Sequence, residues 1–364
     1  MVAGVSLPGF GDESATERAR HIASGIRSLT VQNVVNGVLG FVFLTMMLRL
    51  LSPSDYGLYS AALLVTTLGS SVAVFGLQYA ATRFVAYMAH DEWESRLASR
   101  SIVLLSLVFA SVATVIYVVL SPVIAEYFTR SDSTEWIFAA SGAWLFSITM
   151  SGIFQGLVQG MRKYQTLAKI LMCANSATVG LTVLGLIEFH SVLVPIVAWV
   201  AYGAVVILWS LHITRKPLLV ATQTGAAGKT VKQVLRYSMP LGIAGIVTVA
   251  TGAADPMVVG GFLNTAQLGA YYAAIAISGG LGVMLFTPLN TAFFSETSTN
   301  ANDPGKLSAG LRLAFRYTAL ALIPVSFALV GLSKQMIRLF AGGISSYLLA
   351  NPSLQMMSAF FLFV

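Results

Sequence analysis

Long uninterrupted apolar runs follow one another along almost the whole chain. A helix that crosses a bilayer needs about 20 predominantly apolar residues, and its backbone polar groups must bond within the segment because lipid offers them no partner. Only 10% of the 364 residues are charged and 56% are hydrophobic, whereas globular domains carry about 25% charged residues. The chain is therefore predicted to be an all-α, polytopic membrane protein without a large soluble catalytic domain.

The apolar runs predict nine membrane helices and the beginning of a tenth. The nine cover residues 30–50, 58–80, 101–121, 137–158, 166–187, 191–211, 238–262, 268–293 and 311–331, and the tenth begins near 352. They lack the ten-residue alternation of a membrane β-barrel, so the fold class is a transmembrane helical bundle. The single cysteine, Cys173, excludes an intrachain disulfide.

The positive charges sort between the two sides of the predicted bundle. Residues 1–29 have no apolar core and are predicted to be a cytoplasmic tail rather than a signal peptide. With that tail inside, 17 of the 21 Lys and Arg residues fall on the inside, as the positive-inside rule requires. The four on the outside are Arg49, Arg130, Lys334 and Arg338. This pattern favours a multi-pass plasma-membrane protein with a cytoplasmic N-terminus, and it argues against nucleic acid as the partner of a chain with net charge +7.

An internal repeat joins the beginning of the chain to its last third at a constant spacing, which we call the repeat interval. The identical pairs in one loop region, all at this spacing, are Leu51/Leu263, Gly57/Gly269, Tyr59/Tyr271, Ala61/Ala273 and Ala62/Ala274. Because six helices intervene between equivalent points, both copies enter the membrane from the same side, as parallel repeats do. We therefore expect a six-helix bundle over 30–212 (the first half), a cytoplasmic linker over 213–237, and a second bundle over 238–364 (the second half) that is truncated after about three and a half helices.

Four segments resemble a known family. Residues 47–61 are similar to the junction between the first two helices of polysaccharide biosynthesis membrane proteins, and the further matches are residues 152–164, 235–241 and 255–263. These proteins are the oligosaccharide flippases of the multidrug/oligosaccharidyl-lipid/polysaccharide exporter superfamily. The resemblance covers the chain from about Ile26 onward, and it implies a carrier of twelve to fourteen helices that moves a lipid-linked oligosaccharide.

Asp255 is the ionisable residue that lies clearly deep within a predicted span. Charged residues in a membrane are costly and usually face a cavity, a partner or the interface. Thr248, Thr251 and Gly252 share its helical face, and the following Pro256 is expected to bend or open the helix and free carbonyl oxygens for a small cation. The hypothesis is a Na⁺ or H⁺ coupling site at Asp255 and Thr251. The alternative is a carboxylate that pairs with an arginine or caps a kink.

Polar residues of the first span are candidate substrate contacts. Asn33 shares a face with Gly37 and Gly40, with Asn36 three residues further on; such a stripe serves either tight helix packing or a hydrated lumen. Arg49, near the outer end, either snorkels or holds a pyrophosphate with its planar guanidinium. The remaining candidates, whose alternative roles are membrane insertion and interhelical hydrogen bonding, are Arg83, Gln78 and Asn290.

The predicted function is export of a polyprenyl-linked oligosaccharide by alternating access, with the bilayer and the lipid-linked oligosaccharide as partners. Glycosyltransferases or a polymerase of the same pathway are candidate partners. No catalytic residue, metal site or cofactor is predicted beyond the coupling ion, since the four histidines lack metal-ligand spacing. Two alternatives stay open: a multidrug or organic-cation antiporter of the same superfamily, and a membrane-embedded glycan polymerase or ligase, which would need an outside loop longer than 122–136.

Overall fold

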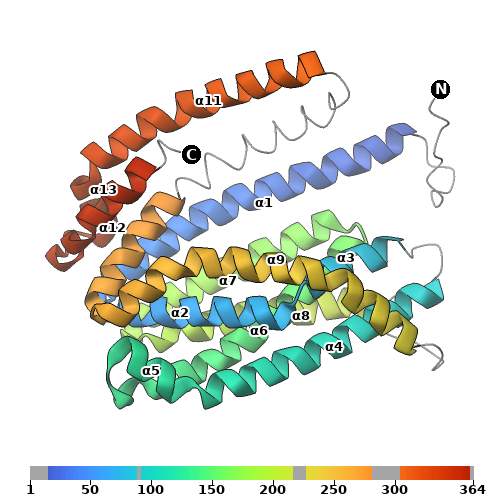
Figure 1. Ribbon diagram of the computed structural model, residues 1–364, viewed down its shortest axis with the longest axis horizontal. Coiled ribbons are helices and arrows are strands. Elements are labelled where there is room, and N and C mark those ends of the chain that lie inside the picture. The colour runs from blue at the N-terminus through green and yellow to red at the C-terminus, as the bar shows by residue number, and fades with distance from the viewer. Residues whose placement is uncertain (1–14, 88–91, 216–226, 281–303, 361–364) are drawn as a thin grey trace.

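The computed structural model of the chain is built from helices, and it describes residues 15–87, 92–215, 227–280 and 304–360 (Figure 1). Within these ranges it contains no strand, which confirms the all-α fold class. The elements are α1 (Ala15–Leu50), α2 (Pro53–Val74), α3 (Leu77–Tyr87), α4 (Glu92–Val119), α5 (Ser121–Thr129), η1 (Asp132–Thr134), α6 (Glu135–Gly160), α7 (Tyr164–Phe189), α8 (Leu193–Thr214), α9 (Ala227–Phe262), a helix over 265–280, α11 (Pro304–Gly331), α12 (Ser333–Ala341), η3 (Ser345–Ala350) and α13 (Asn351–Phe360).

Eight helices of the described residues are long and apolar enough to cross a membrane. They are α1 from Arg27, α2, α4 from Leu97, α6, α7, α8, α9 from Val231 and α11 from Ser308. The predicted span over 268–293 is helical as far as residue 280 and continues outside the described residues. The helix α1 already begins at Ala15, within the predicted tail, and α9 begins at Ala227, within the predicted linker.

The predicted span over 58–80 was wrong as one helix, because the chain turns at Phe75 and Gly76 between α2 and α3. Both residues have positive φ, 41° and 74°. A Cβ at Gly76 would overlap the Ser238 carbonyl and lie 2.7 Å from the Gly242 nitrogen, so α9 passes directly over this turn. The apolar run continues through the break, so hydropathy did not reveal it; Gly76 is the residue that permits both the turn and the close approach.

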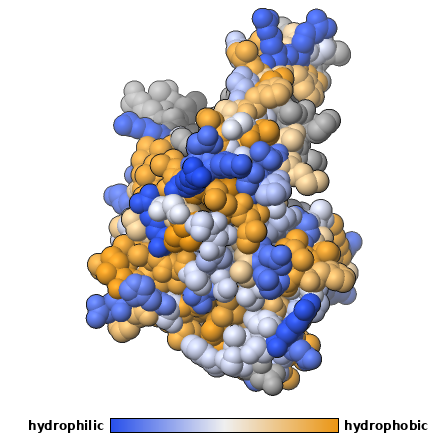
Figure 2. Space-filling view, turned by 90° about the vertical axis from the view of Figure 1, so that its left-hand side faces the viewer, coloured by the Kyte–Doolittle hydropathy of each residue, from blue (hydrophilic) through white to orange (hydrophobic). Residues whose placement is uncertain are grey.

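The helices α5 and α12 lie in segments that were predicted to be loops. Each follows a long helix after a single residue, Leu120 or Leu332, and each has nine residues. A nine-residue helix is too short to span a bilayer, so a search for spans does not detect it. Figure 1 shows both at the same end of the molecule, which we call the α5–α12 end. Figure 2 views this end and shows hydrophilic residues among hydrophobic ones.

The ends of three helix pairs follow the repeat interval found in the sequence. The last residues of α1 and α9, the last residues of α4 and α11, and both ends of α5 and α12 are separated by the same spacing as Leu51 and Leu263. The described chain thus repeats the positions of these helix ends along with the identical residues. The division into two bundles with a linker between them stays a prediction.

The first half packs around α6, which contacts α2, α3, α4 and α8, while α1 packs mainly on α7. Its interior holds an aromatic cluster, in which the Trp144 ring stacks on Tyr59 at 5.8 Å and on Trp199 at 6.1 Å. From the second half, α9 lies across α2, α3 and α4, and α12 touches α1. In Figure 1, α11 lies away from this group, and it contacts α12 and α13.

Candidate functional site

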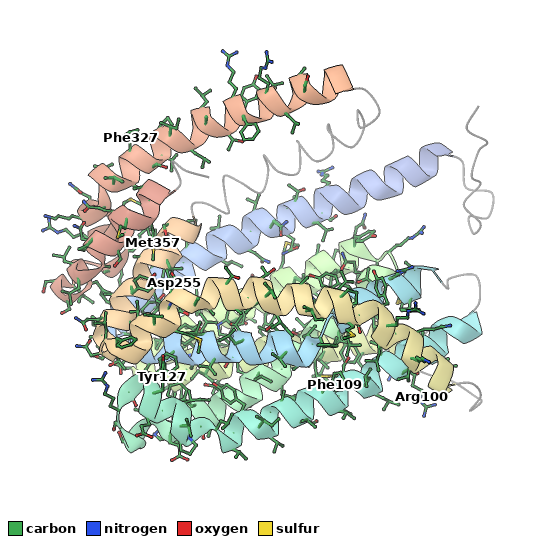
Figure 3. The ribbon with its side chains drawn as sticks, viewed as in Figure 1. Arg100, Phe109, Tyr127, Asp255, Phe327 and Met357 are labelled. Atoms are coloured by element: carbon green, nitrogen blue, oxygen red, sulfur yellow. The ribbon has the colours of Figure 1, made fainter. Side chains whose placement is uncertain are left out.

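Asp255 lies on α9 with its side chain exposed within the described structure (Figure 3). Its Oδ2 accepts a hydrogen bond from the Tyr271 hydroxyl, with the two oxygens 2.5 Å apart. Tyr271 belongs to the helix over 265–280, which follows α9 after a short turn. The carboxylate is therefore held by a neutral tyrosine. It has a defined position and no charge partner among the described residues.

The helix α9 continues without interruption through Pro256. The predicted opening of the helix at this residue was therefore wrong, and the other predicted outcome, a bend, stays a prediction. Proline has no N–H, so the Gly252 carbonyl four residues earlier still lacks its usual donor. A free carbonyl one turn from Asp255 adds a second oxygen to the same stretch of α9.

Thr251 and Thr248 complete an exposed polar strip on α9 together with Gly252 and Asp255. The Thr251 hydroxyl donates to the Val247 carbonyl at 2.8 Å, and the Thr248 hydroxyl donates to the Ala244 carbonyl at 2.9 Å. Each hydroxyl proton is thus used within the helix, so both oxygens remain available as acceptors. We call Thr248, Thr251, Gly252 and Asp255 the α9 strip; it carries only oxygen ligands, the type that hard cations prefer.

Arg49, although exposed, is bonded to the backbone of α12 in this structure. Its Nη2 donates to the Leu339 carbonyl at 2.8 Å and its Nε donates to the Phe340 carbonyl at 3.3 Å, so the guanidinium caps the C-terminal end of α12. A cation at a helix C-terminus is favourable because unpaired carbonyls and the helix dipole meet there. Contact with a pyrophosphate stays a prediction, and in this conformation two of the five N–H donors are already engaged.

The polar stripe of α1 is not used for tight helix packing among the described residues. Asn33 is exposed, and a Cβ at Gly37 or at Gly40 would meet nothing within 4 Å. The Asn36 Oδ1 is buried and has no hydrogen-bond partner in the described part of the chain. Of the two roles predicted for this stripe, tight packing is therefore not realised here, and contact with a hydrated lumen stays a prediction.

Arg83 and Gln78 lie on α3. The Arg83 guanidinium carbon is 4.2 Å from the centroid of the Tyr237 ring on α9, which is a cation–π contact between α3 and α9. Gln78 is partly buried beside α6, where its Oε1 would lie 3.3 Å from a Cβ at Gly152. Asn290 lies outside the described residues. The structure thus distributes the described candidates over five places: the α9 strip, the end of α12, the α3–α9 contact, the α3–α6 contact at Gln78, and the exposed stripe of α1.

Sequence reasoning did not find the groups that hold these residues. Tyr271 was identified as a repeat position but not as the donor to Asp255, because the two are brought together by a turn between helices. Tyr237 and the α12 carbonyls carry no sequence signal of their own. Among the described residues, no group of three or more His, Cys, Asp and Glu side chains is placed to hold a metal ion.

Comparisons with known proteins identify the fold. The most informative match is the inward-facing conformation of a multidrug resistance MATE family transporter of the MOP superfamily, with a TM-score of 0.67 and 15% identity, covering 93% of this chain and 81% of that chain. The outward-facing conformation of a MATE family transporter gives a TM-score of 0.52 at 15% identity, covering 93% and 76%. A MATE in complex with MaL6 gives 0.51 at 14% identity, covering 93% and 77%.

No curated protein sequence matches the chain. The polysaccharide biosynthesis protein family matches residues 46–344, a stretch that begins within α1 and ends just after α12. This stretch includes Asp255, Tyr271, Arg49 and Arg83. With a match over most of its length, and with the fold of a MOP superfamily transporter, the chain belongs to the polysaccharide biosynthesis protein family.

Proposed function

We propose that this protein is a plasma-membrane flippase that moves a polyprenyl-linked oligosaccharide from the cytoplasmic to the outer leaflet. The family match over residues 46–344 is the observation that carries this proposal. The transporter fold and eight helices long enough to span a bilayer support an exporter rather than an enzyme. The glycan head would cross between the two halves while the polyprenyl tail stays in the bilayer.

The positive-inside count supports an orientation with the N-terminus in the cytoplasm and the α5–α12 end outside. The halves touch at that end, through α1 and α12 and through α5 and α9. The higher TM-score to the inward-facing than to the outward-facing MATE structure agrees with a state that is closed outside. Alternating access then requires these outer contacts to separate after the substrate has entered from the cytoplasm.

The α9 strip is the proposed coupling site. Asp255 with its Tyr271 donor, the Thr251 hydroxyl oxygen and the Gly252 carbonyl offer an anionic oxygen and two neutral ones within two turns of helix. Sodium or a proton would bind to Asp255 and neutralise it, which lowers the cost of enclosing this carboxylate when the halves move. For the substrate we propose contacts with Asn33, Asn36, Gln78, Arg83 and Asn290, and with Arg49 once it leaves α12.

The test is transport by the purified protein in proteoliposomes. A fluorescent lipid-linked oligosaccharide is followed between leaflets with and without a Na⁺ or H⁺ gradient. We expect leaflet exchange that depends on one gradient, and Asp255→Asn is expected to abolish that dependence. Glu188→Gln is the control, since it removes an exposed carboxylate at the end of α7, away from the α9 strip. If lipid-linked oligosaccharide does not change leaflet under any gradient, the flippase proposal is wrong.

One observation favours a second function. Asp255 is an exposed carboxylate without a charge partner among the described residues, which suits an organic cation as well as a small inorganic one. The second candidate is therefore an organic-cation antiporter. The same proteoliposomes distinguish the two functions, because an antiporter would expel a fluorescent cation in exchange for the coupling ion and leave the lipid-linked oligosaccharide in its leaflet.

A further inference from the structure

Two equivalent helices of the repeat cross with their backbones in direct contact at the α5–α12 end. A Cβ at Gly57 of α2 would overlap the Thr265 carbonyl oxygen and lie 3.0 Å from the Gly269 nitrogen. A Cβ at Gly269 would overlap the Pro53 carbonyl oxygen and lie 2.8 Å from the Gly57 nitrogen. The two glycines, which the repeat interval pairs in the sequence, therefore face each other across the boundary between the halves. Any larger residue at either position pushes the helices apart.

Two further sets of contacts cross the same boundary and end on backbone carbonyls. From the first half, the Tyr127 hydroxyl donates to the Met257 carbonyl of α9 at 3.2 Å, and Arg130 Nη2 donates to the Gly261 carbonyl at 3.4 Å. Arg49, also from the first half, donates to the Leu339 and Phe340 carbonyls of α12. Phe128 of α5 lies against Gly260, where a Cβ would overlap its ring.

The glycine crossing and the hydrogen bonds share one property: each depends on a backbone group, whereas ring contacts such as Phe41–Phe340 at 5.9 Å and Tyr56–Tyr347 at 6.3 Å cross the same boundary beside them. Side-chain hydrogen bonds to carbonyls can break and re-form without leaving a charge buried, because the groups lie at an exposed end. Close helix contact through glycine gains dispersion energy only while the two backbones touch, so it is lost over a small displacement. The combination suits a closure whose close approach is set by the glycines and whose hydrogen bonds can open and re-form.

We infer that the Gly57–Gly269 crossing and the carbonyl contacts of Arg49, Tyr127 and Arg130 form the outer closure of the transporter. This inference rests on the proposed function. The glycine crossing sets the distance between α2 and the helix over 265–280. The carbonyl contacts on either side hold the two halves at that distance. Opening to the outside separates all of them together.

The experiment measures the separation of the halves directly. Spin labels are placed at Glu126 of α5 and Arg338 of α12, which are exposed and equivalent in the repeat, after Cys173→Ser removes the single native thiol. Distances are recorded by pulsed electron paramagnetic resonance in lipid nanodiscs without substrate. We expect a predominant short distance in the parent chain and a shift of the main population to longer distances in Gly57→Ala and in Gly269→Ala.

The matched control is Gly180→Ala in α7, where an added Cβ meets nothing within 4 Å. Its distance distribution should coincide with that of the parent. If Gly57→Ala and Gly269→Ala also keep the parent distribution, the crossing does not set the closure and the inference is overturned.

A second pair of variants covers the case in which added bulk prevents folding. Tyr127→Phe and Arg49→Met remove the donors to the carbonyls without adding volume, and together they should increase the long-distance population. An unchanged distribution in this double variant would overturn the inference. The readout contains no transport step, so a chain that opens and closes as described but moves no lipid-linked oligosaccharide refutes the proposed function and leaves the closure intact.

Discussion

Three equivalent positions of the two halves have opposite surroundings. In the first half, Phe43 and Tyr59 face each other at 6.3 Å between ring centroids, and Trp144 stacks on Tyr59. The positions one repeat interval further on are Asp255, Tyr271 and Met356. There the ring contact is replaced by the hydrogen bond from Tyr271 to Asp255, and Met356 is 81% exposed whereas Trp144 is 1% exposed.

The comparison shows that two equivalent helix pairs, α1 with α2 and α9 with the helix over 265–280, have different roles. In the first half the pair of α1 and α2 fills an interior, and even the Tyr59 hydroxyl is satisfied from within, by the Trp199 indole N–H at 3.0 Å. In the second half the equivalent tyrosine, Tyr271, donates its hydroxyl to the exposed carboxylate of Asp255. We therefore expect substitutions in the first-half cluster to change stability, and substitutions around Asp255 to change transport.

The largest expected effect is that of Trp144→Ala. The ring is fully enclosed between Tyr59 and Trp199, so its removal leaves a cavity and should lower the free energy of unfolding by about 3–5 kcal/mol. Thermal unfolding in detergent checks this expectation. The matched control is Met356→Ala at the equivalent exposed position, which should leave Tm nearly unchanged. Equal losses in both variants would contradict the proposed difference between the halves.

The second largest effect on stability is expected when the residues at the equivalent positions 43 and 255 are exchanged. Phe43→Asp places a carboxylate in a partly buried position against the Tyr59 and Trp199 rings and should lower the free energy of unfolding by about 3 kcal/mol. The reverse change, Asp255→Phe, falls on an exposed side chain and should retain the fold while abolishing ion-dependent transport. Protein yield, Tm and the leaflet assay are measured for both. A transporting Asp255→Phe variant would show that the polar pair is not functional.

The two equivalent tyrosines provide a smaller and sharper contrast. Tyr59→Phe leaves the Trp199 N–H without its acceptor in a buried site and should cost about 1–3 kcal/mol of stability. Tyr271→Phe removes the donor to an exposed carboxylate and should change stability by less than about 0.5 kcal/mol. The ion concentration for half-maximal transport should shift only in Tyr271→Phe. If this ion concentration shifts in Tyr59→Phe and not in Tyr271→Phe, the coupling site lies in the first half and the proposal for Asp255 is wrong.

The smallest expected effect on stability is that of Thr251→Val. The side chain is exposed and its hydroxyl donates only within α9. The free energy of unfolding should therefore change by less than about 0.5 kcal/mol, which thermal unfolding measures as a nearly unchanged Tm. The variant removes one oxygen from the α9 strip and should weaken the ion dependence of transport. Thr67→Val in α2 is the control, because its exposed hydroxyl also donates four residues back, to the Leu63 carbonyl. Identical ion dependence in both variants would remove Thr251 from the coupling site.

Much of the fold followed from the sequence because lipid imposes a simple rule. Long apolar runs must be helices, and eight of the described helices are long and apolar enough to span a bilayer. The repeat interval was visible in Gly57/Gly269 and in Tyr59/Tyr271, and the last residues of α1 and α9 follow it. The turn at Gly76 and the short helices α5 and α12 were missed, since neither a turn within an apolar run nor a nine-residue helix changes the hydropathy pattern.

The candidate site was foreseen only as a set of residue types. The energetic cost of a charged side chain in lipid identified Asp255 as a candidate, and the helical periodicity placed Thr251 on the same face of the helix. Neither argument identifies a partner. The donor from Tyr271 to Asp255, the α12 carbonyls on Arg49 and the Tyr237 ring under Arg83 all come from other helices. The bonds from Arg49 to the α12 carbonyls could not be read from the sequence, and its predicted contact with the substrate stays a prediction.

The sequence by itself determined the helical class, the number of apolar runs, the repeat interval and the presence of an acidic residue within a span, because each of these depends on the solvation of a single segment. The tertiary structure alone decided that Gly57 meets Gly269, that Phe43 packs on Tyr59 and Trp199 while its counterpart Asp255 is exposed, and that Arg49 caps α12. These features depend on which helices lie next to each other. That choice is made by many weak packing contacts between helices of similar hydropathy, which no single segment encodes.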